Sequence, residues 1–439
     1  MVVSSTLKYE NSEAFARSMD EGDPLKSYRE QFFIPTRDSL ADGRHDEGAE
    51  PCIYLAGNSL GLQPKNVRDY INKELEDWAA YGVEGHFHAR KPWLPYHENL
   101  TEMSARLVGA KPIEVVVMNT LTTNLHLMMV SFYRPTEKRH KIVIEAGAFP
   151  SDQYAVASQA EFHGFKAEDA VLELKPRDGE DTLRSEDILA FIEQHGDEVA
   201  LVMLGNVNYL TGQAFDVPSI AAAAHKVGAN FGLNLAHGAG NLHLKLHDWD
   251  VDFAVWCSYK YLNSGPGSLA GCFVHERHAE SFDLPRFAGW WGHDKKTRFE
   301  MGPHFDPISG AEGWQLSNPP IFQLAALRAS LSIFDRVGME AIREKGDKLT
   351  GFLEYLLNEI PDDFCTIITP ASPAERGCQL SIRFRKDVET RGLLARLKEE
   401  GAICDFREPD IIRAAPAPLY NSYQDVYKFA CILRSFAGH

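Results

Sequence analysis

Short apolar runs alternate with amphipathic segments between residues 110 and 275, and this alternation constrains the fold more than any other feature of the sequence. The runs with strand character are residues 114–118, 141–145, 170–174, 200–204, 229–234, 253–257 and 269–274. The segments with helical spacing between them are residues 122–132, 151–163, 185–195 and 217–227. Strands that alternate with helices form βαβ units, because a parallel connection needs a long crossover. We therefore expect an α/β fold with a mainly parallel sheet whose faces are covered.

The pattern differs on either side of this region, and it predicts three parts in the chain. Residues 1–50 are polar with helix-like pieces, so we expect an N-terminal helical extension there. Residues 51–310 form the expected large domain, in which 65–81 has the spacing of an amphipathic helix. Residues 311–439 form the expected smaller C-terminal α+β domain, which contains a long helical stretch at 320–360.

The charge balance excludes several classes of partner. The 439 residues carry 45 basic and 62 acidic side chains, and the resulting net charge of −17 opposes non-specific binding to nucleic acid or to anionic membranes. No run approaches the length of about 18–20 strongly apolar residues that a membrane span requires. The seven cysteines are scattered without a C-x-x-C pair, and the N-terminus has no signal pattern, so we expect a reducing, cytoplasmic location.

Lys260 is the leading candidate for a catalytic group. It follows the apolar run 253–257 and Tyr259, and a glycine-rich turn at 264–271 comes next. Burial at such a position lowers the pKa of an amine, which can then act as a nucleophile that forms a Schiff base. The alternative is a strand-end lysine on the surface, and the residues that accompany Lys260 decide between the two.

A pyridoxal phosphate site needs, besides its lysine, a phosphate cradle, a flat side chain against the ring and a polar partner for the ring nitrogen. Thr122 lies where a strand leads into a helix, and helix N-termini with hydroxyl groups bind phosphate. Phe149 could stack on the ring, Asp152 could orient its phenolic oxygen, and Asn234 ends a strand where the nitrogen partner would fall. Each has a plainer alternative, since Thr122 and Asp152 could cap helices and Asn234 could be a turn residue.

The histidine spacing gives only a weak indication of a metal site. His86, His88 and His97 lie close in the sequence, and so do His243 and His247. Neither group comes with a matched set of carboxylates or cysteines, so we expect no metal.

Ten segments distributed from about residue 50 to the C-terminus are informative through their order. They are YLAGNSLGLQP, HARKPW, NTLTTNLHLMM, EAGAFPSDQYA, VNYLTGQ, LAHGAGNLHLKLHDWDVDFAVWCSYKYLN, GWWGH, QLSNPP, ERGCQLSI and APLYNSYQDVYKF. In this order they resemble the kynureninase family of pyridoxal phosphate enzymes, and the resemblance covers nearly the whole chain. It implies the fold-type-I, aspartate aminotransferase-like architecture, with a large cofactor-binding domain and a smaller C-terminal domain. It also implies a homodimer with shared active sites.

The resemblance implies a role for each candidate residue. Lys260 would form the imine with the cofactor, and Tyr259 would donate or shuttle a proton. The residues that would line the cofactor are Leu121, Thr122, Phe149, Asp152, Asn234, His237, Tyr259, Lys260, Trp290 and Asn318, of which Trp290 and Asn318 would act in part across the dimer interface. The residues that would bind the substrate are Ser59, His86, Asn318 and Arg413, of which Arg413 would hold the carboxylate. In the family, such a histidine and asparagine accompany acceptance of the 3-hydroxy substrate.

The reaction implied by the resemblance is the hydrolysis of L-kynurenine or 3-hydroxy-L-kynurenine. The products would be anthranilate or 3-hydroxyanthranilate together with L-alanine, in tryptophan catabolism and NAD biosynthesis. Another fold-type-I lyase or a transaminase is the alternative. A cysteine desulfurase would need a mobile cysteine near the lysine, whereas Cys257 and Cys272 lie in expected strands.

Two positions depart from the family pattern. Family members usually have aspartate where this chain has Asn234, and animal-type members have serine where it has Gly205. An aspartate holds a proton on the pyridine nitrogen, and loss of that charge-assisted bond would slow carbanion formation by about 10- to 150-fold. Asn234 is then an engineered substitution, a natural change in a working enzyme, or the mark of an impaired or divergent activity.

Overall fold

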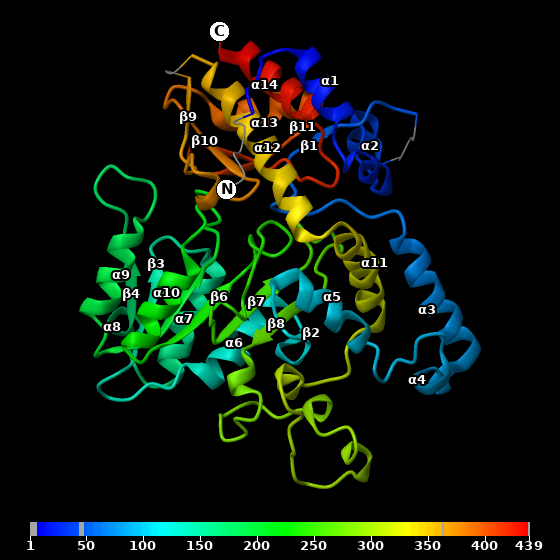
Figure 1. Cartoon of the computed structure of the whole chain (residues 1–439), viewed down its shortest axis with the longest axis vertical. Helices are drawn as coiled ribbons and strands as arrows, with labels where there is room; N and C mark the ends of the chain where they lie inside the picture. The colour runs from blue at the N-terminus through cyan, green and yellow to red at the C-terminus, as the bar shows by residue number, and fades with distance from the viewer. Residues whose placement is uncertain (1–6, 44–47, 362–363, 438–439) are drawn as a thin grey trace. The chain divides into compact units, whose positions relative to one another are not determined.

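The computed structural model describes residues 7–43, 48–361 and 364–437, which form two compact units (Figure 1). The large unit contains Asn66–Tyr209 and Gln213–Met339. The small unit contains the described residues of Met1–Lys65, Leu210–Gly212 and Glu340–His439.

A seven-stranded sheet forms the centre of the large unit (Figure 1). Its strands are β2 (Val115–Met118), β3 (Lys141–Glu145), β4 (Val171–Leu174), β5 (Val199–Gly205), β6 (Asn230–Asn234), β7 (Phe253–Cys257) and β8 (Ala270–Val274). They lie in the order β2-β8-β7-β6-β5-β3-β4. The neighbours from β7 to β4 pair in parallel, and only β8 runs antiparallel to β7 and β2. The prediction of a mainly parallel sheet is confirmed.

The burial of these strands explains why the sequence pattern located them. Every residue of β2, β7 and β8 is buried, so the strands are continuous apolar runs rather than alternating ones. Each of the seven predicted strands, and each of the four helices predicted between them, matches an observed element to within one residue at either end.

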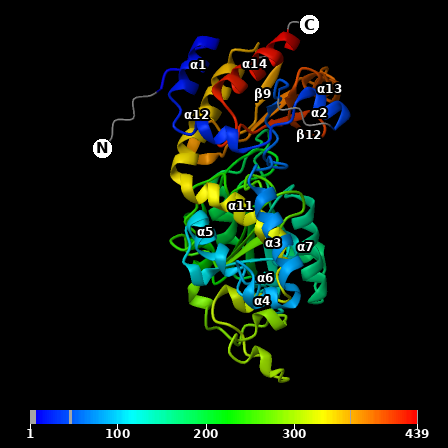
Figure 2. The ribbon, with the colours of Figure 1, turned by 90° about the vertical axis from the view of Figure 1, so that its right-hand side faces the viewer.

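Helices surround the sheet of the large unit. They are α3 (Val67–Tyr81), α4 (Gly85–His88), α5 (Glu98–Val108), α6 (Leu121–Phe132), α7 (Pro150–Phe162), α8 (Ala167–Ala170), α9 (Ser185–Gln194), α10 (Val217–Lys226) and α11 (Ile321–Val337). Helix α11 packs against α3 and α5, as Figure 2 shows. The long helical stretch predicted at 320–360 is instead two helices, α11 and α12 (Met339–Asn358), because Gly338 adopts φ 81° and ends the first one.

The small unit contains two sheets and five α-helices among the described residues. Strands β9 (Cys365–Ile367), β10 (Leu380–Phe384), β12 (Asp405–Arg407) and β13 (Ile411–Ala414) form an antiparallel sheet in the order β12-β13-β10-β9. Strands β1 (Ile53–Tyr54) and β11 (Ala402–Ile403) pair in parallel. The helices are α1 (Glu13–Glu21), α2 (Arg37–Asp42), α12, α13 (Thr390–Glu399) and α14 (Tyr423–Ala437).

Short 3-10 helices connect several of these elements. They are Lys26–Gln31, Gly82–Glu84, Pro112–Glu114, Glu276–His278, Trp290–Gly292, Arg298–Glu300, Ala311–Trp314 and Pro373–Glu375. Among the described residues, no helix combines the length and the apolar character needed to cross a membrane.

Asp252 anchors the edge of the large sheet at which β6 and β7 begin. Its carboxylate accepts the backbone N–H of Phe231 at 2.7 Å and lies 2.9 Å from His225 Nε2, 2.8 Å from His278 Nε2 and 2.6 Å from an Arg277 nitrogen. Burial alone would raise the pKa of Asp252, but the two imidazoles and the guanidinium hold that pKa far below its usual range. The charged form of Asp252 therefore stabilises the folded chain.

We expect Asp252→Asn to lower the free energy of unfolding by about 1.5–3 kcal/mol at neutral pH, because Arg277, His225 and His278 lose hydrogen bonds to a charged group. A carboxyl with a lowered pKa contributes stability above its unfolded pKa of about 3.9 and loses that contribution as the pH falls below it. Urea unfolding at pH 7 and pH 3.5 measures both effects. The difference between wild type and variant should shrink at the lower pH, and the exposed Asp248→Asn should show no such difference. An equal loss for both substitutions would contradict the role of Asp252.

Candidate active site

A pocket opens in the large unit at the edge where the parallel strands end. Strands β3, β5, β6 and β7 all finish at this edge, as parallel strands must, and ligands of such sheets bind there. The residues that line the pocket are Leu121, Thr122, Glu145, Phe149, Ser151, Asp152, Gly205, Val207, Tyr209, Asn234, Ala236, His237, Tyr259 and Lys260. The structure thus brings together every residue predicted to line the cofactor except Trp290 and Asn318.

Lys260 lies in a tight loop directly after β7. The backbone N–H of Ser264 donates to the Ser258 carbonyl at 3.1 Å, and the N–H of Asn263 donates to the Lys260 carbonyl at 3.0 Å. The Lys260 Nζ lies 3.0 Å from His237 Nε2 and 5.9 Å from the centroid of the Phe149 ring. The amine therefore faces the pocket, which disfavours the alternative of an ordinary surface lysine.

Asn234, at the end of β6, is bound to Asp152. The Asn234 amide donates to both carboxylate oxygens of Asp152, at 2.9 and 2.8 Å, and its own oxygen accepts the backbone N–H of Ala236 at 2.8 Å. Burial raises the pKa of Asp152 to about 6, against the opposing effects of the Asn234 hydrogen bond and the Lys260 charge. Asn234 thus orients a buried carboxyl group rather than merely closing a turn.

The first turns of α6 and α7 meet at the pocket. The hydroxyl groups of Thr122 and Ser151 lie 2.7 Å apart, and no side chain caps either helix. The capping alternatives for Thr122 and Asp152 are therefore not what the structure shows. Two helix N-termini that carry hydroxyl groups favour an anion such as phosphate.

An aromatic pair lines another wall of the pocket. Phe149 is 46% exposed, which is unusual for a large apolar side chain that serves packing alone. The ring of Tyr209 meets it edge to face, with centroids 5.3 Å apart and planes at 82°. Tyr209 was missed in the sequence because it lies in a loop without a regular pattern.

Glu145 is a second residue that the sequence analysis missed. It ends β3, is 4% exposed, and accepts the backbone N–H of Gly205 at 3.2 Å on each oxygen. Burial, with a further contribution from Asp152, raises the pKa of Glu145 to about 8. Its place at the end of a predicted parallel strand was the signal that could have found it.

Tyr259 and Cys257 lie side by side next to Lys260. Burial and the neighbouring Cys257 raise the pKa of Tyr259 well above its usual range, so its phenol keeps its proton. Burial likewise raises the pKa of Cys257, which opposes formation of a thiolate.

Other predicted residues of the large unit lie outside this pocket. Trp290 is 42% exposed and lines a separate hollow that contains Arg298 and Phe305. Asn318 lines a third hollow with Asn119 and Gly267. His86 packs against Trp93 with ring centroids 5.6 Å apart.

The small unit holds the other two predicted residues, Ser59 and Arg413. Ser59 is exposed after β1. Arg413 is 1% exposed on β13, directly opposite Asp405 on β12. Its Nε and a terminal nitrogen lie 2.9 and 2.8 Å from the two Asp405 oxygens, a bidentate ion pair that fixes the plane of the guanidinium.

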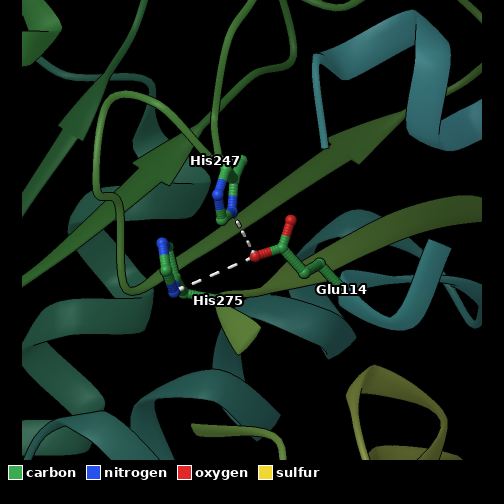
Figure 3. Close-up of side chains that lie close together, drawn as sticks. All are labelled: Glu114, His247 and His275. Atoms are coloured by element: carbon green, nitrogen blue, oxygen red, sulfur yellow. Dashed lines mark hydrogen bonds and ion pairs between the residues drawn. The ribbon is translucent and has the colours of Figure 1, made fainter. Parts of the chain in front are cut away.

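Glu114, His247 and His275 place their donor atoms within 4.8 Å of one another (Figure 3). One Glu114 oxygen lies 2.9 Å from His247 Nδ1, and the carboxylate also accepts the backbone N–H groups of Glu276 at 2.8 Å and Lys111 at 2.7 Å. The two imidazole rings are stacked with an interplanar angle of 19°, so they do not direct their lone pairs to one point. The group is a hydrogen-bonded anchor for a buried carboxylate.

Solved structures with a similar fold include a cysteine desulfurase and a protein with a PLP cofactor. A cysteine desulfurase from Thermococcus onnurineus aligns with a TM-score of 0.74 and 18% identity over 88% of this chain and 95% of its own. A C-DES variant with glycine covalently linked to its PLP cofactor aligns with a TM-score of 0.74 and 17% identity over 92% and 98%. At this identity the likeness shows the fold alone, and it confirms the predicted fold-type-I architecture.

Curated relatives share far more of the sequence. Kynureninase from Myxococcus xanthus is 66% identical over 98% of both chains. Kynureninase from Koribacter versatilis is 58% identical over 96% of this chain and 97% of its own, and that from Nematostella vectensis is 51% identical over 97% and 94%. A family profile described as "Kynureninase C-terminal domain" matches residues 342–433. The chain therefore belongs to the kynureninase family.

Proposed function

We propose that the chain hydrolyses L-kynurenine or 3-hydroxy-L-kynurenine to anthranilate or 3-hydroxyanthranilate and L-alanine, with pyridoxal phosphate on Lys260. The observation that carries this proposal is the pocket that joins Lys260 to Asp152, Asn234 and Phe149 in a chain 66% identical to a curated kynureninase. On this proposal the protein acts in tryptophan catabolism and NAD biosynthesis, in the cytoplasm.

The residues of the pocket fit the proposed cofactor. The hydroxyl groups of Thr122 and Ser151, at two helix N-termini, would hold the phosphate. Phe149 would lie against the ring, and the buried Asp152 carboxyl, held by Asn234, would face its nitrogen. When bound, the cofactor supplies an electron sink for the negative charge that develops at the substrate Cα.

The protein side chains would bind the substrate and move its protons. Lys260 would be the base that takes the proton from the substrate Cα. Tyr259 keeps its proton and can therefore donate it, since burial and Cys257 raise its pKa. Arg413, oriented by Asp405, would bind the substrate carboxylate bidentately. Water would add to the γ-carbonyl carbon before the Cβ–Cγ bond breaks.

We propose that the chain works as a homodimer with shared active sites. Trp290 and Asn318 lie outside the pocket of Lys260, and a second copy would bring them to it. The segment around Trp290 exposes large apolar side chains that a partner would cover: Phe282, Phe287, Trp290, Phe299 and Met301 are 42–76% exposed. Large apolar side chains exposed along one segment are typical of an interface.

The structural likeness to cysteine desulfurases does not extend to their nucleophile. Cys257 and Cys272 are buried in strands, and burial raises the pKa of both thiols. Neither is the mobile cysteine that a desulfurase needs.

Lys260→Ala should lower the rate of anthranilate release by at least about 10²- to 10⁴-fold, because the base and the covalent attachment point are both lost. Fluorescence of the released anthranilate measures the rate. The exposed Lys245→Ala in the same unit is the control and should keep the wild-type rate. A Lys260→Ala protein that still turns over kynurenine at a comparable rate would disprove the assignment.

Asn234→Asp should change kcat at neutral pH by less than about tenfold. The new carboxylate would lie within 3 Å of Asp152, and two carboxyls at this separation share one proton, so the pair keeps a single charge. The cofactor-free variant should lose thermal stability between pH 5 and pH 8 more steeply than wild type, because the second ionisation becomes unfavourable.

The exposed Asn99→Asp is the control for Asn234→Asp and should leave the pH dependence of stability unchanged. A gain in kcat of tenfold or more for Asn234→Asp would show that a charge at position 234 itself limits the reaction.

A further inference from the structure

Two carboxyl groups line the pocket, but their surroundings differ. Asp152 has charge-stabilising partners, namely two contacts with the Asn234 amide and the nearby Lys260 ammonium. Within the described part of the chain, the hydrogen-bond partners of Glu145 are backbone groups, namely its own N–H and the N–H of Gly205, whose nitrogen lies 3.2 Å from both carboxyl oxygens. A buried carboxylate with so few donors is unfavourable in its charged form.

Glu114 is another buried glutamate of this chain, and its hydrogen-bond donors differ from those of Glu145 (Figure 3). It is 0% exposed, close to the 4% of Glu145. Its oxygens accept two backbone N–H groups at 2.7 and 2.8 Å, and an imidazole nitrogen of His247 lies 2.9 Å away. Glu145 has no imidazole at such a distance in the contacts described for it, and its N–H contacts are longer. The two glutamates are equally buried, yet only Glu114 has donors suited to a charge.

The titratable groups around Glu145 come from each element at the pocket edge. They are Asp152 on α7, His237 after β6, Tyr209 after β5, and Tyr259 and Lys260 after β7. Burial raises the pKa of Glu145 to about 8 and that of Asp152 to about 6, and the charge of Asp152 adds to the effect on Glu145. Asp152 therefore ionises first as the pH rises, and Glu145 follows under mildly alkaline conditions.

We propose that Glu145 is a positioning residue that keeps its proton at neutral pH and so leaves Asp152 as the single carboxylate charge of the pocket. The role toward the cofactor rests on the proposed function. With Glu145 neutral, the charge of Asp152 is available to Lys260 and to the ring of a bound cofactor. With Glu145 charged, the pocket would hold two anions and would repel a ligand that carries a phosphate dianion.

The absence of a side chain at Gly205 leaves space for the carboxyl group of Glu145. A Cβ at position 205 would lie 2.8 Å from Glu145 Oε1, closer than real Cβ contacts. A serine there would displace the carboxyl group. The effect of Gly205 is therefore more than the loss of one hydroxyl group, because a glycine at this position leaves space for the Glu145 carboxyl group.

Infrared spectroscopy of the cofactor-free full chain at pH 7 tests the protonation state. Wild type should show the C=O stretching band of a buried protonated carboxylic acid, and Glu145→Gln should lose that band. Glu173→Gln is the matched control, because Glu173 pairs beside Ile144 on the neighbouring strand but is exposed, and it should leave the band unchanged. Absence of the band in wild type, or its persistence in Glu145→Gln, would overturn the proposal.

The pH dependence of cofactor affinity tests the positioning role. At pH 7 pyridoxal phosphate should bind cofactor-free wild type and Glu145→Gln with dissociation constants within about twofold, because the side chain is neutral in both. At pH 9 wild type should bind about 3- to 10-fold more weakly than the variant, because Glu145 is then charged. An unfavourable charge interaction of about 1.4 kcal/mol corresponds to a tenfold increase in the dissociation constant. If the dissociation constants of the two proteins change with pH in the same way, the positioning role of Glu145 is wrong.

These measurements are independent of the proposed reaction. A wild type that binds pyridoxal phosphate with the expected pH dependence but releases no anthranilate from kynurenine would refute the proposed function and still support the role of Glu145. A wild type that releases anthranilate but lacks the infrared band would refute the role of Glu145 alone.

Discussion

Parallel pairing of β3, β5, β6 and β7 is the constraint on which the site depends. It brings four strand ends to one edge, and each end carries a polar residue or leads directly to one. The strands can have this arrangement only because their side chains are apolar on both faces and are covered by helices. The polar groups are thereby confined to the ends, where Asn234 and Lys260 meet Asp152 from the start of α7. The same packing that stabilises the sheet concentrates its chemistry at one edge.

Buried carboxyl groups at the two ends of the strands have pKa values that are shifted in opposite directions. Asp252 lies among His225, His278 and Arg277, and its pKa falls far below the usual range. Burial is the largest effect on Glu145 and Asp152, and their pKa values rise to about 8 and about 6. The first arrangement favours a permanent charge and serves stability. The second costs stability at neutral pH, and carboxyls that are costly to ionise are found where a protein binds or transforms a ligand.

The parts of the fold and site that could be predicted are those determined by residues close together in the sequence. The strands are continuous apolar runs, and the candidates at their ends, such as Asn234 and Lys260, followed from position and from family resemblance. Tyr209 was missed because its loop has no period, and Glu145 because a single strand-end glutamate is common on surfaces. The pairing of Arg413 with Asp405 depends on strand register, which eight residues of separation do not reveal. The break at Gly338 was missed because glycine is tolerated within helices and only the backbone angle shows the end.

The structure also changes the interpretation of Asn234. Considered alone, an amide in place of an aspartate removes a charge from the cofactor site. The Asn234 oxygen accepts the N–H of Ala236, which orients the amide so that its nitrogen faces Asp152. An amide nitrogen in this orientation cannot accept a hydrogen bond from a protonated ring nitrogen, but it holds in place the Asp152 carboxylate, which on the proposed function would accept that bond. On the proposed function the charge would be carried by Asp152, the hydrogen-bonded neighbour of Asn234, and a neutral Glu145 would add no second carboxylate charge to the pocket. On the proposed function Asn234 is compatible with a working enzyme, because Asp152 supplies the anion and Asn234 holds it in place.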